Sequence, residues 1–391
     1  MTTTVFDEST IQLLAKRFLT VTKRVVEWYH ADRSPPLTVE QMQALDASEY
    51  DCLVTTYNDT NNRLDLNRSL IPIFQDIVHR FPDQVALQTD SSAMTYAALD
   101  LASNRLAAYL SKRTSGERIG LCFSDARNYI ISMLAVLKCG AAYVPISTDD
   151  PVARIDYILE DLDLGCVLSN YAQHALFNDL KNSPEIVYID QLTEGLIDEP
   201  DNFQSVPREA NDLAYVMYTS GSTGNPKGVM ISDLAVYSLV VQNTSLALSE
   251  NTKVALLSNL AFDASTFEIW GTILNGGTLY MPQNVLQFIN NMDKFKSRLH
   301  EFGVNTLWLT KSLFDKIFSL EPAVFEHIEF LIVGGEALNA SLIKQLKKSK
   351  YAPANILNGY GPTENTTFSC LYNVSKAGLD IKEHVPIGRP L

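Results

Sequence analysis

The spacing of apolar positions divides the chain into a helical N-terminal segment and a longer region in which helices and strands alternate. Along residues 8–30, apolar side chains recur at helical spacing, as at Ile11, Leu14 and Phe18, and this predicts one amphipathic helix. The prolines of "ADRSPPLTV" end that pattern, and the polar stretch "DTNNRLDLN" is typical of turns. Residues 1–65 are therefore predicted to form a helix and a linker rather than a domain.

From about residue 66 the pattern becomes that of an α/β protein. Helical stretches such as "SLIPIFQDIVHRFP" alternate with short apolar runs that predict buried strands. These runs are "RIGLCF", "AAYVPI", "LGCVLSN", "IVYID", "LAYVMYT", "VALLSNLAF", "GTLYMP", "NTLWLT" and "FLIVGGEAL". The alternation implies βαβ units and largely parallel sheets flanked by helices. Within residues 66–391, the polar stretch 193–212 is the predicted seam between two α/β lobes.

Charge and apolar content exclude several classes of protein. The chain has 45 acidic against 31 basic residues and a formal net charge of −14. This balance argues against a nucleic-acid partner, because such binding rests on clustered Lys and Arg. No apolar run approaches the length that crosses a bilayer, and no signal segment follows Met1. We therefore expect no membrane partner and a cytoplasmic location. The five cysteines show no metal-ligand spacing.

The stretch "YTSGSTGNPKGVMI", residues 218–231, is the strongest candidate for chemistry. It follows a predicted buried strand and combines glycines with four Ser/Thr hydroxyls and one lysine. Glycines allow consecutive backbone N–H groups to point inward, and such a nest suits a polyphosphate. The stretch is not a Walker A motif, because Pro226 stands in the place of the second glycine and Lys227 precedes an extended segment rather than a helix. The alternative is a Gly/Ser-rich surface loop without a ligand.

At this loop the chain closely resembles the adenylate-forming enzymes, which include amino-acid adenylation domains, acyl-CoA synthetases, aryl-acid ligases and luciferases. Three further segments, "LKCGAAYVPI" (137–146), "NLAFDASTFEIWGTILNGGTLY" (259–280) and "NGYGPTEN" (358–365), resemble motifs of nonribosomal peptide synthetase adenylation domains in their order and spacing. The resemblance covers roughly residues 66–391. It implies the large N-terminal subdomain of an adenylation domain: two α/β lobes, with a few extra strands or a small β-barrel portion near residue 385.

The resemblance also implies a reaction and a nucleotide site. A substrate carboxylate would attack the α-phosphate of ATP, giving an acyl adenylate and pyrophosphate, with Lys227, Thr219 and Glu364 as the catalytic residues. Glu364 would carry Mg²⁺, which prefers oxygen ligands. The residues that the resemblance assigns to the nucleotide are Thr219, Ser220, Gly221, Ser222, Thr223, Gly224 and Lys227 around the β- and γ-phosphates, Gly335 and Glu336 as a wall, Asn358 and Tyr360 at adenine, and the neighbouring Gly359, Gly361 and Thr363. The alternatives are that Glu364 caps a helix and that Tyr360 is an ordinary half-buried core aromatic.

Asp263 indicates which carboxylic acid is activated. It stands in the apolar stretch "LAFDASTF", where a lone carboxylate is costly to bury unless a cation pairs with it. By resemblance, the aspartate at this position binds the α-ammonium group of an amino-acid substrate, which argues against a fatty or aryl acid. The alternative is that Asp263 is only the N-cap of a helix starting near Ser265.

The substrate side chain would enter a short apolar pocket. By resemblance, Phe267 and Trp308 shorten this pocket, and Thr367 is its polar member besides Asp263. This pattern is similar to the family's valine pattern, so valine is the expected substrate. Isoleucine or a similar residue is expected to be accepted weakly, because one methylene changes recognition by only about 1–3 kcal/mol. The full set of pocket residues is Asp263, Ala264, Phe267, Trp308, Ile332, Gly334, Gly359, Thr367 and Phe368.

The chain departs from the family pattern in two places. Asp233 stands where most relatives have a histidine. The C-terminal subdomain, which carries a catalytic lysine in the family, is absent from this sequence. Residues 1–58 resemble the tail of a condensation domain and its linker, which implies a carrier protein and a condensation domain as partners in a multidomain synthetase. Three alternatives stay open: an incomplete fragment that only binds ATP and amino acid, an acyl- or aryl-CoA ligase, and a nucleotide-binding scaffold.

Overall fold

A computed structural model describes residues 8–31, 36, 38, 44–60, 65–113, 117–181, 184–192, 199–220, 225–241, 245–376 and 384–391. The chain divides into two compact units, Met1–Asn62 and Arg63–Leu391. The first unit contains α1 (Glu8–His30), α2 (Ala47–Asp51) and the π-helical turn η2 (Cys52–Thr56). The predicted N-terminal helix is confirmed with both of its bounds.

Helix α1 is amphipathic but buries none of its residues, so Phe18 on its apolar side is 71% exposed. Ion pairs join α1 to the segment of α2: Arg17 contacts Glu49 at 2.5 Å, and Lys16 contacts Asp46. Whether this unit is the tail of a condensation domain stays a prediction. So does the seam at 193–212, whose first part, residues 193–198, lies outside the described residues.

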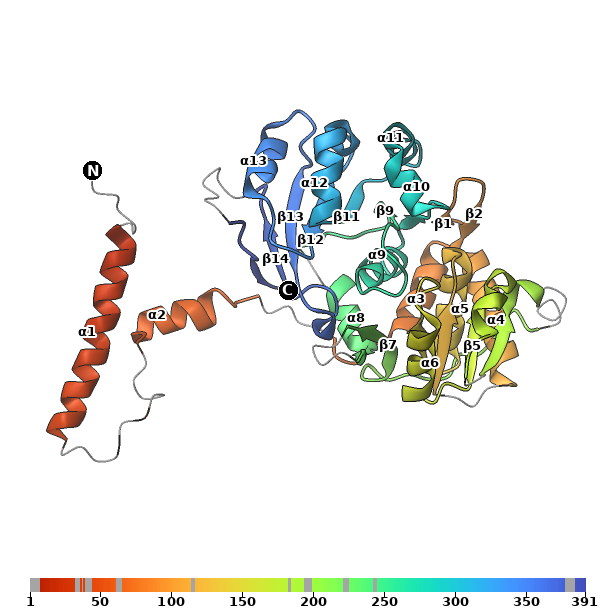
Figure 1. Cartoon of the computed structure of the whole chain (residues 1–391), viewed down its shortest axis with the longest axis horizontal. Coiled ribbons are helices and arrows are strands. Elements are labelled where there is room, and N and C mark those ends of the chain that lie inside the picture. Colours follow the sequence, from red (N-terminus) through yellow and green to blue (C-terminus); the bar gives the residue numbers. More distant parts are fainter. Residues whose placement is uncertain are drawn as a thin grey trace. The chain divides into compact units, whose positions relative to one another are not determined.

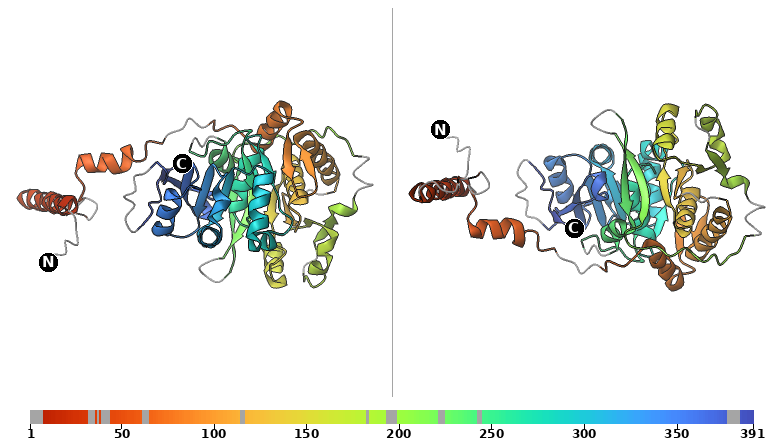
Figure 2. Two further views of the ribbon diagram at one scale, coloured as in Figure 1. Left: turned by 90° about the horizontal axis from the view of Figure 1, so that it is seen from above. Right: turned by 90° about the horizontal axis from the view of Figure 1, so that it is seen from below.

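The second unit contains two sheets (Figures 1 and 2). The described part of the larger sheet has the order β15-β14-β13-β12-β11-β9-β10-β1-β2 and is parallel from β13 to β1, with antiparallel pairs at both edges. Its strands are β1 (Val85–Gln88), β2 (Ala93–Thr95), β9 (Lys253–Ala255), β10 (Thr278–Tyr280), β11 (Thr306–Thr310), β12 (Phe330–Gly334), β13 (Asn355–Tyr360), β14 (Cys370–Asn373) and β15 (Arg389–Pro390).

The smaller sheet has the order β6-β5-β3-β4-β7-β8 in its described part. It is parallel except for the final β7–β8 pair, which is an antiparallel hairpin. Its strands are β3 (Arg118–Cys122), β4 (Ala142–Pro145), β5 (Cys166–Ser169), β6 (Glu185–Tyr188), β7 (Leu213–Thr219) and β8 (Lys227–Ser232). The predicted fold of two α/β lobes with mostly parallel sheets is confirmed. The extra strand expected near residue 385 is β15, and the described strands close no barrel.

Helices flank both sheets (Figure 2). The helices of this unit are α3 (Leu70–Arg80), α4 (Tyr96–Ser111), α5 (Ala126–Lys138), α6 (Val152–Asp161), α8 (Asp233–Val240), α9 (Ala264–Ile273), α10 (Val285–Asn290), α11 (Met292–Glu301), α12 (Lys311–Leu320) and α13 (Ala340–Lys348). The 3-10 turns are η3 (Tyr171–Phe177), η4 (Ile189–Gln191), η5 (Pro322–Phe325) and η6 (Thr363–Asn365). Throughout the described ranges, no helix combines the length and apolarity needed to cross a bilayer.

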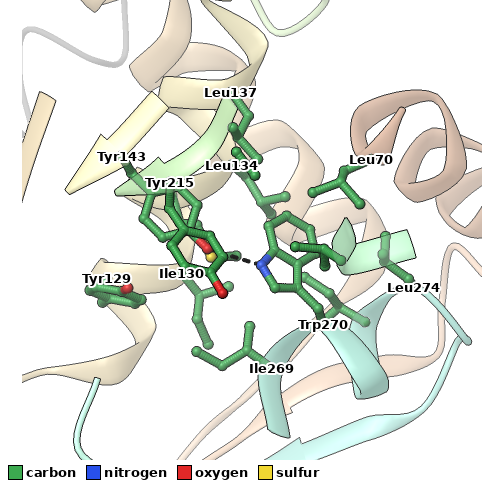
Figure 3. Packing of buried hydrophobic residues seen from close by; sticks show 14 of the residues in the cluster. Leu70, Tyr129, Ile130, Leu134, Leu137, Tyr143, Tyr215, Ile269, Trp270 and Leu274 are labelled. Atoms are coloured by element: carbon green, nitrogen blue, oxygen red, sulfur yellow. Dashed lines mark hydrogen bonds between the residues drawn. The ribbon is translucent and has the colours of Figure 1, made fainter. Parts of the chain in front are cut away.

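Helix α9 joins the two sheets. Every residue from Ser265 to Ile273 of its sequence "ASTFEIWGTI" is buried, so the helix is enclosed on all sides even though it includes polar residues. The Trp270 indole N–H donates to the Tyr143 hydroxyl of β4 at 3.0 Å, as Figure 3 shows. The Thr266 hydroxyl donates to the Tyr215 hydroxyl of β7 at 3.0 Å. Because α9 follows β9 of the larger sheet, these bonds connect the larger sheet to strands β4 and β7 of the smaller one.

The apolar run "VALLSNLAF" is only partly a strand. The sequence predicts a strand over 254–262, but β9 ends at Ala255. The reason is Glu268 on α9, whose carboxylate accepts the backbone N–H groups of Leu257 at 3.2 Å and Ser258 at 3.1 Å. These amides are satisfied by a side chain rather than by a neighbouring strand. The chain therefore leaves the sheet and forms the loop that leads into α9.

Candidate functional site

The predicted phosphate loop is the turn of the β7–β8 hairpin. Thr219 and Lys227 are cross-strand partners at its base, and an extended strand follows the lysine, as the sequence predicts. Ser220 and Lys227 are exposed, and Lys227 makes no ion pair with any described residue. A lysine at this position is therefore available to an anionic ligand. Four predicted phosphate contacts lie outside the described residues: Gly221, Ser222, Thr223 and Gly224.

The predicted adenine site lies at the carboxyl ends of two neighbouring parallel strands, where open α/β sheets bind ligands. Tyr360 ends β13 and is 52% exposed, so it is not a core aromatic and its ring is open to a planar ligand. Gly335 and Glu336 follow β12 and are exposed. Asn358 is buried, and its side-chain amide donates to the Pro386 carbonyl at 2.8 Å. This N–H group is therefore already hydrogen-bonded within the protein.

The segment after β13 folds back tightly at Gly361. A Cβ atom at Gly361 would lie 2.5 Å from the Thr367 carbonyl oxygen and 2.6 Å from the Ser369 nitrogen, so only glycine fits there. Thr366 and Thr367 both adopt left-handed backbone conformations, with φ of 54° and 67°. Such conformations are strained for β-branched residues, and they persist only where the surroundings hold them.

Asp263 receives two hydroxyl groups from this folded-back segment. The Thr363 hydroxyl donates to the Asp263 carboxylate at 2.7 Å, and the Thr367 hydroxyl donates to the Asp263 backbone carbonyl at 2.7 Å. Asp263 does stand at the N-cap position of α9, but its side chain makes no capping hydrogen bond. Burial raises the pKa of Asp263, the bond from Thr363 lowers it, and the charge of Glu364 raises it further. No described residue forms an ion pair with Asp263.

Glu364 belongs to the turn η6, and its charge acts on the nearby carboxylate of Asp263. It is exposed and makes no hydrogen bond or ion pair with any residue that the structure describes. The N-cap of this short turn is Pro362, so Glu364 does not cap a helix. In the described ranges, no group of three or more His, Cys, Asp or Glu side chains is arranged to hold a metal ion. An oxygen-seeking cation at Glu364 would therefore take further ligands from phosphate or water, which is the usual mode for Mg²⁺.

The hairpin lies next to the segments that carry Asp263 and Glu364. Strand β8, which carries Lys227, lies against η6, which carries Thr363 and Glu364. Strand β7 reaches α9 through the bond between Tyr215 and Thr266. The structure thus places the strand that begins at Lys227 against the turn of Thr363 and Glu364, and Thr363 in turn contacts Asp263.

The predicted side-chain pocket is walled by three aromatic rings. Trp308 and Ile332 are register partners on β11 and β12, and Gly334 pairs with Gly359 on β13. Phe368 packs against Trp308 and Phe267, with ring centroids 5.0 Å and 5.5 Å apart. A Cβ at Gly359 would lie 2.8 Å from the Phe368 ring, so glycine lets this ring rest on the sheet.

The two polar members of the predicted pocket are both hydrogen-bonded within the protein. Thr367 is buried, and its hydroxyl donates to the backbone carbonyl of Asp263. Ala264 follows Asp263 at the start of α9. The part of the pocket beyond Asp263 therefore offers mainly apolar and aromatic surface. Such a surface suits an uncharged, apolar side chain.

Asp233 is a structural residue. It is fully buried at the start of α8, and Arg208 binds it in a bidentate manner at 2.9 and 3.1 Å. The Leu70 backbone N–H also donates to its carboxylate, at 3.1 Å. The aspartate that replaces the family's histidine thus connects α8 to the start of α3. A buried aspartate is expected to have a cationic partner, but the sequence does not indicate which arginine is that partner.

Sequence reasoning missed two features near this site. Glu268 is fully buried, and burial raises its pKa to about 8. Its position in an apolar stretch was the only signal in the sequence. A cavity of about 840 Å³ also opens at the carboxyl ends of β3, β4, β9 and β10, and no predicted site residue lines it. Its lining includes Arg127, Ser147, Asn259, Leu260 and Met281.

Comparisons with known proteins show the family and the fold of the chain. The family described as AMP-binding enzyme matches residues 74–391. Tyrocidine synthase 3 of Brevibacillus parabrevis is 32% identical over 391 residues, covering 100% of this chain and 6% of its own length. Gramicidin S synthase 2 of Brevibacillus brevis is 30% identical over 392 residues, covering 100% of this chain and 8% of its own length. The chain thus spans only a small part of these curated relatives.

Two solved structures are similar in fold. The N-terminal subdomain of Klebsiella oxytoca NpsA, in complex with 3-hydroxybenzoyl-AMSN, has a TM-score of 0.74 and 27% identity over 83% of this chain and 80% of its own. The nonribosomal peptide synthetase FmoA3 has a TM-score of 0.83 over 99% of this chain and 40% of its own, and at 21% identity it supports the fold alone. Because the family match extends over residues 74–391, far more than half of the sequence, the chain belongs to the AMP-binding enzymes, a family of adenylate-forming ligases.

Proposed function

We propose that this chain activates an α-amino acid, with valine as the best candidate, by forming an aminoacyl adenylate from ATP within nonribosomal peptide synthesis. The observation that carries the proposal is Asp263. Its side chain is half-buried, has no cationic partner among the described residues, and accepts the hydroxyl of Thr363, the residue directly before Glu364. A carboxylate that has lost part of its hydration and has no cationic partner is stabilised by a bound cation, and the α-ammonium group of an amino acid supplies one.

In the proposed reaction, a carboxylate oxygen of the amino acid attacks the α-phosphorus of ATP. The new bond joins that oxygen to phosphorus, the bond from the α-phosphorus to the α,β-bridging oxygen breaks, and pyrophosphate leaves with the bonding electrons. Thr219, Ser220 and Lys227 hold the β- and γ-phosphates, and Tyr360 stacks on adenine. Mg²⁺ bound at Glu364 would supply neutralisation of phosphate charge. Most of the rate enhancement then comes from positioning and electrostatics.

The contacts of the pocket support a short, branched, apolar side chain. The Phe368 ring packs against both Trp308 and Phe267, and the three rings together leave little room for a long side chain. The Thr367 hydroxyl donates to the Asp263 backbone carbonyl, so it is not available to a polar substrate side chain. Valine fits this description. Isoleucine is expected to be accepted weakly, since one methylene changes recognition by only about 1–3 kcal/mol.

An aryl-acid substrate is the second candidate, because the similar NpsA subdomain has been solved with 3-hydroxybenzoyl-AMSN and anthranilyl-AMSN. Asp263 argues against it, since an aryl acid without an ammonium group leaves this half-buried carboxylate without a cationic partner. For partners, we propose a carrier protein and a condensation domain. The structures of the NpsA–ThdA fusion and of PA1221, which contain adenylation and PCP domains, support the carrier.

The test is amino-acid-dependent exchange of labelled pyrophosphate into ATP, measured over all twenty amino acids and a set of aryl and fatty acids. We expect exchange with valine that Asp263→Ala abolishes, while ATP binding is retained. Asp156→Ala is the control, because Asp156 is a buried aspartate outside the predicted site that accepts one backbone N–H, from Lys181 at 2.9 Å. Exchange with an aryl acid and with no amino acid would contradict the proposal. Heat stabilisation by ATP and valine without exchange would support the binding-only alternative.

A further inference from the structure

We propose that Thr363 is a positioning residue that couples the amino-acid site to the nucleotide site, through its hydrogen bond to Asp263. This inference rests on the proposed function, because it takes Asp263 as the ammonium site and the segment around Glu364 as part of the nucleotide site. The sequence assigns Thr363 to the nucleotide alone. In the structure, its hydroxyl donates to the Asp263 carboxylate at 2.7 Å, across 100 positions of sequence.

The first argument is the position of Thr363 between two groups of ligand contacts. It is followed directly by Glu364, the proposed Mg²⁺ ligand, and Tyr360 lies three residues before it. On the other side, its hydroxyl holds one oxygen of Asp263. A hydroxyl has one hydrogen to donate, and here Asp263 receives it. Any shift of this turn when nucleotide binds therefore changes the orientation of the Asp263 carboxylate.

The second argument is that the turn is stiff enough to transmit such a shift. The Thr366 N–H donates to the Thr363 carbonyl at 3.1 Å, and the Ser369 N–H donates to the Tyr360 carbonyl at 2.8 Å. Gly361 packs so closely against the returning backbone that no side chain fits. Close-packed interiors transmit displacement instead of absorbing it.

The third argument is a second connection from the same segment. Thr367 donates its hydroxyl to the Asp263 backbone carbonyl at 2.7 Å. Thr366 and Thr367 are both buried and both in the left-handed region, which β-branched residues adopt only where neighbours impose it. Residues 363–367 therefore form hydrogen bonds both to the backbone of Asp263, through Thr367, and to its side chain, through Thr363. Of these two contacts, the one from Thr363 reaches the carboxylate that binds substrate.

The direction of the coupling follows from this geometry. Nucleotide contacts at Tyr360 and Glu364 fix the turn, and the turn fixes Asp263 in the orientation that receives an ammonium group. Valine should therefore bind more tightly to the nucleotide-loaded protein. By thermodynamic reciprocity, valine tightens nucleotide binding by the same factor, which for coupled sites is typically about 5- to 150-fold.

The experiment is isothermal titration calorimetry of valine, with and without saturating α,β-methylene-ATP and Mg²⁺. We expect about a tenfold tightening of valine binding by the nucleotide in the unaltered chain. Thr363→Ser keeps the hydroxyl and should keep this factor. Thr363→Val and Thr363→Ala should reduce it to within about twofold, while valine binding itself weakens. Measuring both variants guards against misfolding of one, and thermal unfolding reports whether each is folded.

Each result decides a different claim. Unchanged coupling in a folded Thr363→Val or Thr363→Ala variant would overturn the inference, since a purely structural threonine would weaken binding without altering the coupling factor. Loss of coupling in Thr363→Ser as well would also overturn it. If the unaltered chain binds α,β-methylene-ATP but no amino acid, the proposed function fails instead, and the two failures are thereby distinguished.

Discussion

Trp308 and Phe368 pack ring against ring, with their centroids 5.0 Å apart and their planes inclined by 58°. Trp308 lies on β11 of the larger sheet, whereas Phe368 follows the strained turn after β13. Phe267 of α9 contacts the same Phe368 ring from another direction. The three aromatic residues that the resemblance assigns to the substrate side chain therefore form one contiguous cluster rather than separate contacts.

We expect Trp308→Leu to lengthen the pocket and to change which amino acid is activated. Valine-dependent pyrophosphate exchange should fall and exchange with leucine or phenylalanine should rise, because misfit by one methylene is worth about 1–3 kcal/mol, or roughly 10- to 200-fold. Phe314→Leu is the control, because Phe314 is a buried aromatic in the separate apolar cluster under α12. If Trp308→Leu and the control both keep the same order of preference among amino acids, Trp308 does not contact the substrate side chain.

Gly361→Ala should displace the turn that holds Asp263. The added Cβ would lie 2.5 Å from the Thr367 carbonyl oxygen, closer than any real contact, so the backbone must move. We expect the valine dissociation constant, measured by calorimetry, to rise about tenfold or more, which corresponds to about 1.4 kcal/mol. Gly165→Ala is the matched control, because nothing lies within 4 Å of a Cβ there. Equal valine binding in the two variants would show that the turn does not position Asp263.

Glu268 should make folding stability depend on pH. Burial raises its pKa in the folded protein to about 8 from the ordinary 4.5. Between these values the folded state holds a proton that the unfolded state has lost, so the contribution of Glu268 to stability falls as pH rises from about 4.5 to about 8. We expect the unfolding free energy of the unaltered protein, relative to Glu268→Gln, to fall by at most about 1.4 kcal/mol per pH unit in this window.

Urea unfolding at several pH values between 5 and 9 measures this difference. Glu117→Gln is the surface control, because the Glu117 side chain is 89% exposed. A difference between the unaltered protein and Glu268→Gln that stays constant from pH 5 to pH 8 would mean that Glu268 keeps an ordinary pKa. The same constant difference would mean that the bonds from the Leu257 and Ser258 amides offset the cost of burying the carboxylate.

The ion pair between Arg208 and Asp233 should be important for stability but not for substrate choice. Both side chains are essentially fully buried, so Arg208→Met leaves an unpaired charge, at a cost of about 3–5 kcal/mol. Adding Asp233→Asn should recover part of this loss, because the amide is neutral and still accepts the Leu70 N–H. Urea unfolding of the single and double variants tests this. A double variant less stable than Arg208→Met alone would contradict the explanation.

Local patterns were sufficient to predict many elements of this fold. The bounds of α1, and the strand before and extended segment after the predicted phosphate loop, follow from periodicity and from glycine and proline chemistry. Long-range side-chain contacts were not predictable in this way. The run 254–262 fails as a strand because Glu268, ten residues further along the chain, takes the amide of Ser258. In the same way, nothing local to Asp233 indicates that Arg208 neutralises it.

The candidate site shows the same limit. Motif resemblance places Asp263 and Thr363 in the active site, but in different subsites, because each motif is interpreted separately. Only the folded chain reveals that the two side chains are hydrogen-bonded. The exposed ring of Tyr360 is likewise a tertiary property, since an aromatic residue at a strand end can lie on either side of the core boundary.

The most direct test of amino-acid activation is calorimetric binding of two non-hydrolysable adenylate mimics to this chain. One carries a valyl group, and the other carries an isovaleryl group that differs only in lacking the α-ammonium. We expect the valyl mimic to bind at least about 100-fold more tightly, equivalent to about 2.7 kcal/mol, because only it neutralises Asp263. Asp263→Asn should remove most of that difference. Equal affinities for the two mimics in the unaltered chain would contradict the central claim.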